Sequence, residues 1–194
     1  SNNNNLIAFS YFECISDNII GVESYNYTEN ILKTIEGISI FRNLRSIVID
    51  ALYDNKLCID ELVSSMDLTV LSDFRTLRQL KLFRISKLDD ISFVSTLTGL
   101  EKLELIWLAN ITKIPNLANL NNLAEVCIDT LNKLVDITSL VNAPKLRKVK
   151  MLSVKSMTKE SVYAVLDNLN VEELLCFGGK AEISDIHINR KNKE

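Results

Sequence analysis

Apolar residues recur along most of this chain in one frame, which reads apolar, two variable residues, apolar, one variable residue, apolar. Copies of the frame occupy residues 44–49, 77–82, 100–105, 123–128, 146–151 and 171–176. The second half of each copy alternates apolar and variable residues with a period of two. That period is typical of a β-strand with one buried face. The pattern therefore predicts six short strands, one in each copy.

The spacing between the copies indicates a repeat. Their first residues lie at 44, 77, 100, 123, 146 and 171, so the intervals are 33, 23, 23, 23 and 25 residues. In the three repeats that follow residues 82, 105 and 128, apolar residues fall at every third position between strands, which suits turns and short 3₁₀ segments. One unit of this size cannot bury its apolar face alone, but stacked units form a parallel sheet with a shared core behind it.

The frame and its spacing resemble the leucine-rich repeat family, in the short 23-residue form found in bacterial and phosphatase-regulator-like proteins. The resemblance covers residue 35 to about residue 188. It implies an α/β fold: a right-handed solenoid with a parallel sheet on its concave face, and with turns, 3₁₀ segments and one late helix on its convex face. One feature departs from the family. Aliphatic residues stand where the family usually has Asn: Leu52, Ile85, Leu108, Leu131 and Val154. We expect these side chains to form a buried aliphatic ladder.

We expect a single domain over residues 1–194, with an N-terminal cap at 1–34, six repeats at 35–177, and a C-terminal cap strand and tail at 178–194. The cap should contain a hairpin of residues 6–14 and 19–27, followed by a short helix over 28–35. A helical insertion is expected at 59–66, and a helix over 158–169. Thr158 should cap that helix, and its apolar face should be Val162, Val165, Leu166 and Leu169. After a turn at Gly178, Ile183, Ile186 and Ile188 should return antiparallel and cover the sheet edge.

The composition argues against several classes of partner. Lys and Arg number 22 and Asp and Glu 25, giving a net charge of −3. This balance does not suit nucleic-acid binding, which needs a clustered positive excess. No run approaches the roughly 20 apolar residues of a membrane span. The first residues, 1–5, do not resemble a secretory signal. The four cysteines are far apart, so we expect free thiols and a cytoplasmic location, with a secreted effector as the alternative.

Catalytic and metal-binding patterns are scarce. There is one histidine, His187, and only 5 glycines. We find no Ser/His/Asp or Cys/His constellation, no zinc-ligand spacing and no phosphate-binding loop. We therefore expect a protein that is not an enzyme and has no catalytic residues, no metal and no cofactor. We expect His187 to be an exposed residue of the last strand.

The variable residues of each strand should face outward, because neighbouring side chains on a strand point to opposite faces. The first outward column alternates in sign, from Lys102 to Glu125, Lys148 and Glu173. Near the strand ends the outward residues become apolar and aromatic. We predict a partner-binding surface made of Phe83, Arg84, Ile106, Trp107, Asp129, Leu152, Phe177, Lys81, Glu104 and Lys150. The alternative is that the apolar members pack on each other or beneath a loop.

These patterns favour a noncatalytic protein-recognition module, monomeric when free, that binds another protein through its concave face and strand-exit ridge. Exposed aromatic groups are typical of interaction surfaces, and Trp is enriched at binding hot spots. Two alternatives remain open. One is a bacterial immunity protein that inhibits a cognate toxin, and the other is the repeat portion of a secreted, host-directed effector. The sequence does not identify the partner.

Overall fold

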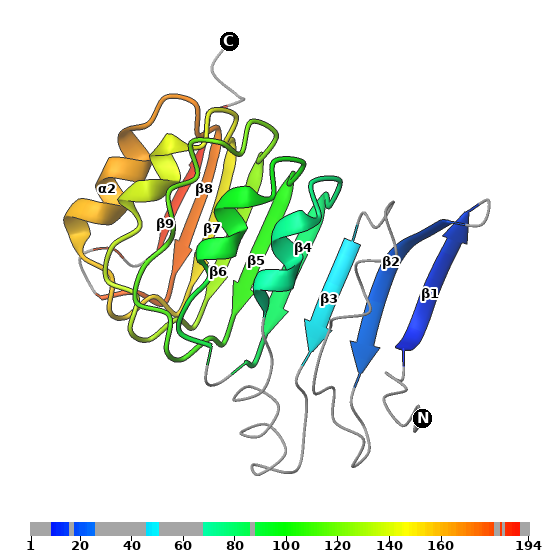
Figure 1. Ribbon diagram of the computed structural model, residues 1–194. Coiled ribbons are helices and arrows are strands. Elements are labelled where there is room, and N and C mark those ends of the chain that lie inside the picture. Colours follow the sequence, from blue (N-terminus) through cyan, green and yellow to red (C-terminus); the bar gives the residue numbers. More distant parts are fainter. Residues whose placement is uncertain are drawn as a thin grey trace.

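The computed structural model describes residues 9–15, 18–25, 46–50, 68–85, 88–180, 183 and 185–190. Within these residues the chain forms one nine-stranded sheet whose strands follow chain order, as Figure 1 shows. The strands are β1 (Phe9–Ile15), β2 (Asn18–Tyr25), β3 (Ser46–Asp50), β4 (Gln79–Phe83), β5 (Lys102–Ile106), β6 (Glu125–Asp129), β7 (Lys148–Leu152), β8 (Glu173–Phe177) and β9 (Ile186–Asn189).

The six strands predicted from the apolar frame are all present, from β3 to β8, and each pairs in parallel with the next. In the regular part, Gln79 lies opposite Lys102, Lys102 opposite Glu125, and Glu125 opposite Lys148. Each step is 23 residues (102 − 79, 125 − 102, 148 − 125). Equivalent positions of successive coils therefore stand side by side. The alignment of the coils is confirmed.

The two ends of the sheet are antiparallel. Strands β1 and β2 form the predicted hairpin, and β2 also continues the parallel sheet by pairing with β3. At the other end β9 runs antiparallel to β8, which confirms the predicted return of the chain. The expected helices at 28–35 and 59–66 lie outside the described residues. The boundaries 1–34, 35–177 and 178–194 and the capping role of the end segments stay predictions.

The core consists of the apolar strand positions and of the ladder that follows each strand. Leu103 and Leu105 of β5 are fully buried, and their counterparts in the neighbouring strands are 0–2% exposed. The aliphatic ladder is confirmed for its described members, because Ile85, Leu108, Leu131 and Val154 are all buried. Leu52 lies outside the described residues. Burial of one such side chain stabilises the fold by about 1.5–3 kcal/mol.

Backbone groups near the ladder bond between coils and within turns, without an Asn side chain. The residue after each of the strands β4–β7 donates its N–H to the carbonyl of the last residue in the next strand. The N···O distances are 3.0 Å from Arg84 to Ile106 and 2.9 Å from Trp107 to Asp129. Inside the turn, the N–H of Leu134 donates to the carbonyl of Leu131 at 3.1 Å. These bonds satisfy groups that would be costly to bury unpaired.

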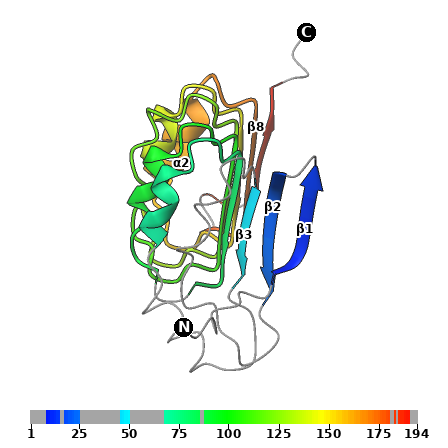
Figure 2. The ribbon, with the colours of Figure 1, turned by 45° about the vertical axis from the view of Figure 1, so that its right-hand side comes forward.

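The wall opposite the sheet carries short helices, as the view along the coil in Figure 2 shows. These are the 3₁₀ helices η2 (Leu68–Asp73), η3 (Ser92–Thr96) and η4 (Thr138–Asn142), and the α-helix α2 (Lys159–Asp167). The expectation of 3₁₀ segments and one late helix is confirmed. Thr158 caps α2 as predicted, since its hydroxyl accepts from the N–H of Ser161 at 3.2 Å.

The predicted apolar face of α2 needs one correction. Val162 and Val165 are buried and Leu166 is partly buried, as expected. Leu169, however, is 84% exposed. The helix ends at Asp167, and Asn168 already has an extended backbone with ψ of 112°. Leu169 therefore lies beyond the helix, and the chain has turned it away from the core.

Candidate protein-binding surface

The open face of the sheet begins with a charged column at the start of the strands. Its Lys148 ammonium lies 3.6 Å from Glu125 Oε1 and 3.5 Å from Glu173 Oε2, so one lysine links three adjacent strands. Lys102 instead pairs along its own strand, with its Nζ 3.3 Å from Glu104 Oε1. Exposed pairs of this kind contribute about 0–1 kcal/mol each. Lys148 therefore pairs with the facing carboxylates of both neighbouring strands, whereas within the described residues Lys102 pairs with Glu104 of its own strand.

The middle residues of the strands, which form the second outward column, border a hollow of about 390 Å³. This hollow extends across the sheet from β5 to β9. Its lining residues include Lys102, Glu104, Cys127, Lys150, Leu175 and His187. Burial and the neighbouring Glu104 raise the pKa of the Cys127 thiol, so the thiol stays protonated near neutral pH. His187 lies exposed on β9 opposite Leu175, where the sequence placed it. Of the predicted binding residues, the hollow brings together Glu104 and Lys150.

The ends of the parallel strands share an unusual backbone conformation. The residue directly after each of the strands β4–β8 has a positive φ, between 52° and 69°, and the five residues are Arg84, Trp107, Thr130, Ser153 and Gly178. This left-handed conformation turns the chain out of the strand, and in the first four of these residues the N–H bonds to the next coil. Only Gly178 adopts it without steric cost; the other four have side chains that disfavour it. No glycine stands at the first four of these positions, so nothing in the residue pattern indicated this conformation.

Phe83, Arg84 and Trp107 meet at this exit edge, and we call these three residues the strand-exit cluster. The two ring centroids are 5.7 Å apart and the rings are tilted by 41°. The guanidinium carbon of Arg84 lies 4.0 Å from the Trp107 ring centre and 4.9 Å from that of Phe83. The Lys81 ammonium lies 5.4 Å from the Phe83 ring centre. Two cations therefore stack on two aromatic rings at one spot.

Phe83 also begins a row of predicted residues across the strand ends, in the order Phe83, Ile106, Asp129, Leu152 and Phe177. An outward position predicts exposed side chains for the apolar members, but three of them are only partly exposed. Phe83, Ile106 and Leu152 are half-buried, since each lies beside row neighbours and Phe83 also packs on Trp107. Trp107 and Phe177 are exposed, at 44% and 59%. Asp129, whose carboxylate accepts from the Thr130 hydroxyl at 2.8 Å, divides the row in two.

Among the described residues, no group of three His, Cys, Asp or Glu side chains could hold a metal ion. Cys127 and Cys176 are free, and burial raises the pKa of the Cys176 thiol. No helix within these residues is long and apolar enough to cross a membrane.

The constant register, the short strand in each coil and the buried ladder together decide the architecture. The chain has a leucine-rich repeat fold. No protein-family model matches the sequence, and no curated protein matches it. Two solved structures from Listeria monocytogenes are similar to it. An internalin C2 is 19% identical, with a TM-score of 0.47, over 82% of this chain and 81% of its own. An internalin F is 17% identical, with a TM-score of 0.40, over 86% of this chain and 62% of its own.

Proposed function

We propose that this chain is a noncatalytic recognition module that binds another protein through the strand-exit cluster and the adjoining sheet face. In this proposal the coil is right-handed, as crossover connections between parallel strands almost always are, and its sheet is the concave face. The repeats belong to the 23-residue type, and the chain is a monomer when free. Nucleic acid and membranes are not its partners.

The observation that carries the proposal is the exposed Trp107 ring with the Arg84 guanidinium stacked on it. Trp and Arg are the residue types most enriched at binding hot spots, because they offer a large contact area and defined geometry. The Phe83 ring contacts the Trp107 ring at a centroid distance of 5.7 Å and is itself only partly exposed. The cluster is thus ordered before a partner arrives, which lowers the entropy cost of binding.

In the alternative interpretation, the apolar residues only pack on each other. This accounts for the partial burial of Phe83 but not for the exposed surface of the Trp107 ring. A ring that served packing alone would gain by burying its remaining surface. The positive φ of Trp107 does not by itself indicate function, because Arg84, Thr130 and Ser153 share it. The support therefore lies in the side chains of the cluster and not in backbone strain.

Site-specific photo-crosslinking in the native cell tests the proposal. The crosslinking amino acid replaces Lys150, which is exposed on the sheet face near the row of Leu152. The control position is Glu160, exposed on α2 at the opposite wall. We expect a discrete protein adduct from position 150 and none of the same size from position 160. Adding Trp107→Ala should abolish the adduct without unfolding the chain.

The proposal is overturned if the adduct from position 150 persists at full yield in the Trp107→Ala background, or if both positions give the same adducts. The immunity-protein and effector hypotheses stay predictions, because no described feature distinguishes them from a general binding module. A cytoplasmic location likewise stays a prediction.

A further inference from the structure

The opposite edge of the sheet, where the strands begin, has its own repeating column of residues. This column is Arg78, Glu101, Ala124, Arg147 and Glu172. The carbonyl of each of the first four accepts two N–H groups from the next coil; for Arg147 these come from Glu172 at 2.8 Å and Glu173 at 2.9 Å. The backbone of the column is therefore fixed, while its side chains lie at the surface. We call this region the strand-entrance edge.

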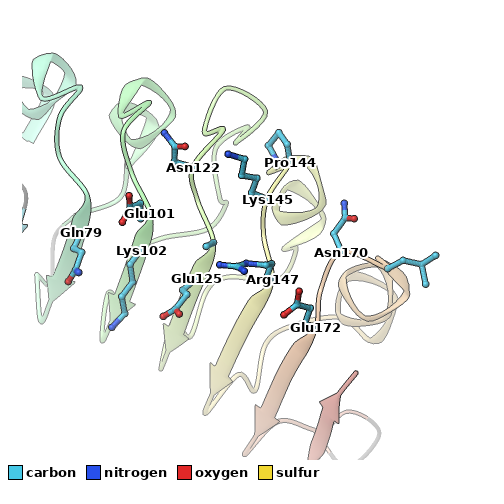
Figure 3. A pocket seen from close by; sticks show the side chains of 12 residues that line it. Gln79, Glu101, Lys102, Asn122, Glu125, Pro144, Lys145, Arg147, Asn170 and Glu172 are labelled. Atoms are coloured by element: carbon cyan, nitrogen blue, oxygen red, sulfur yellow. The ribbon is translucent and has the colours of Figure 1, made fainter. Parts of the chain in front are cut away.

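Ala124 is the one short side chain of this column, and it stands between Glu101 and Arg147. Around it lies an open depression of about 810 Å³, shown in Figure 3. Figure 3 places Glu101, Glu125, Arg147 and Glu172 around it near the strand starts, with Lys145 on the loop above. The depression extends from Gln79 of β4 to Glu172 before β8. Adjacent strands are about 4.8 Å apart, so this is roughly 19 Å across the sheet.

The residues that line the depression carry no net formal charge, and most of their charged side chains already have a partner. Three acidic side chains and three basic ones contribute to the lining. Glu101 is paired with Arg78, Glu125 with Lys148, and Lys102 with Glu104. Glu172 also takes part in a bonding or electrostatic interaction. Within the described residues, no hydrogen bond or ion pair engages the side chains of Lys145 or Arg147. The uncompensated charge of the depression is therefore positive.

Apolar surface accompanies this positive charge. Leu169, which is almost fully exposed, and Pro144 line the same depression as Ala124. A single small anion would leave these groups and most of the span uncovered. A polyanion would meet a glutamate in three of the coils, and like charges brought together at an interface are costly. An extended peptide with spaced carboxylates and apolar side chains between them fits both features.

We infer that the strand-entrance edge binds an extended acidic segment of a partner protein, with its carboxylates on Arg147 and Lys145 and separate apolar side chains against Leu169 and against Ala124. Arg147 suits a carboxylate because its planar guanidinium can donate two parallel hydrogen bonds. This site does not use the strand-exit cluster, so it stands whether or not Trp107 binds a partner.

Fluorescence anisotropy with a labelled peptide tests the inference. The probe is a short peptide in which Asp and Leu alternate between flanking serines. Control peptides replace every Asp with Asn, or every Leu with Ser. We expect saturable binding of the probe that weakens about tenfold or more when salt is raised or when Asp is replaced. Replacing Leu should weaken binding by a smaller factor.

Variants of the protein assign the binding to this edge. Arg147→Glu should weaken binding about tenfold, while the matched control Lys155→Glu, which makes the same change in net charge at an exposed position elsewhere, should not. Ala124→Gln, which fills the depression, should also weaken it. Equal binding by the Arg147→Glu and Lys155→Glu proteins, or no saturable binding of the probe to the unmodified chain, would overturn the inference. Trp107→Ala should leave peptide binding unchanged, which separates this test from that of the proposed function.

Discussion

At both edges of the sheet, backbone hydrogen bonds join successive coils, but the side chains exposed at the two edges differ. At the exit edge, the N–H of Trp107 reaches the carbonyl of Asp129 in the next coil. At the entrance edge, the N–H groups of Arg147 and Lys148 reach the carbonyl of Ala124. The exit edge bears aromatic rings and stacked cations, whereas the entrance edge bears charges on both sides of one alanine.

The difference shows which positions the fold constrains. Both edges are held by main-chain bonds that any residue except proline can make. Their side chains lie outside the core, so the fold leaves their chemistry open. In the core the opposite holds, because the ladder positions must be apolar and of similar size to stack. The residues that distinguish the two edges are therefore where binding specificity can reside.

Removing a core leucine should disturb both edges at once. Leu105→Ala empties a fully buried site behind the sheet and should lower the free energy of unfolding by about 2–5 kcal/mol. Its matched control is Leu169→Ala, an exposed leucine at the entrance edge, which should change stability by no more than about 0.5 kcal/mol. Urea unfolding followed by circular dichroism measures both. Similar losses for the two variants would contradict the assignment of core and surface.

Arg190 completes the entrance edge at the last coil. Its backbone N–H donates to Glu172, and its guanidinium donates to the carbonyls of Asn168 at 2.8 Å, Val171 at 2.7 Å and Leu166. Arg190→Ala leaves partly buried carbonyls at the end of α2 without this donor. We expect a loss of about 1–3 kcal/mol in thermal or urea unfolding.

The control for Arg190 is Arg147→Ala at the same edge, where the side chain is exposed and makes no such bonds among the described residues. It should change the free energy of unfolding by less than about 0.5 kcal/mol. If Arg147→Ala proved as destabilising as Arg190→Ala, its guanidinium would have a structural partner and the binding site inferred at this edge would lose its basis.

Loss of the Trp107 side chain should reduce partner binding at the exit edge more than it reduces the stability of the fold. Trp107→Ala removes one aromatic pair and one stacked cation, so we expect the free energy of unfolding to fall by about 1 kcal/mol. Phe177→Ala, at the other end of the row, should have a smaller effect because Phe177 makes no ring pair and carries no stacked cation within the described residues. Differential scanning calorimetry compares the two. A loss from Trp107→Ala as large as that of a core leucine would show that the ring serves packing.

The smallest expected effect is a gain in stability. Thr130 is β-branched and has a φ of 53°, a conformation that costs such a residue about 1 kcal/mol. Thr130→Asn keeps a polar side chain that tolerates this conformation and should raise the free energy of unfolding by less than about 1 kcal/mol. Thr138→Asn, a surface substitution on η4, is the control and should bring no gain. A destabilised Thr130→Asn protein would show that the 2.8 Å bond to Asp129 outweighs the backbone strain.

Several features of the proposed binding surface could be predicted from the residues alone. The alternation within each frame placed Lys81, Glu104 and Lys150 on the outward face, and the 23-residue spacing placed Phe83, Ile106 and Leu152 in one row. The degree of exposure in that row could not be predicted, because it depends on how Phe83 and Trp107 tilt against each other. The entrance-edge depression was also missed, since a single alanine between charged residues is not a recognisable sequence signal.

The sequence by itself determined the coils, their register and the apolar ladder, because burying a periodic set of aliphatic side chains allows only one alignment of successive units. The tertiary structure alone decided the left-handed turns at Arg84, Trp107 and Thr130, the ion-pair choices of Lys102 and Lys148, and the anchoring of Arg190. These depend on which groups the neighbouring coil brings within hydrogen-bonding or ion-pair distance. Such distances arise from the stacking of whole coils and are not encoded in the spacing of residues within one.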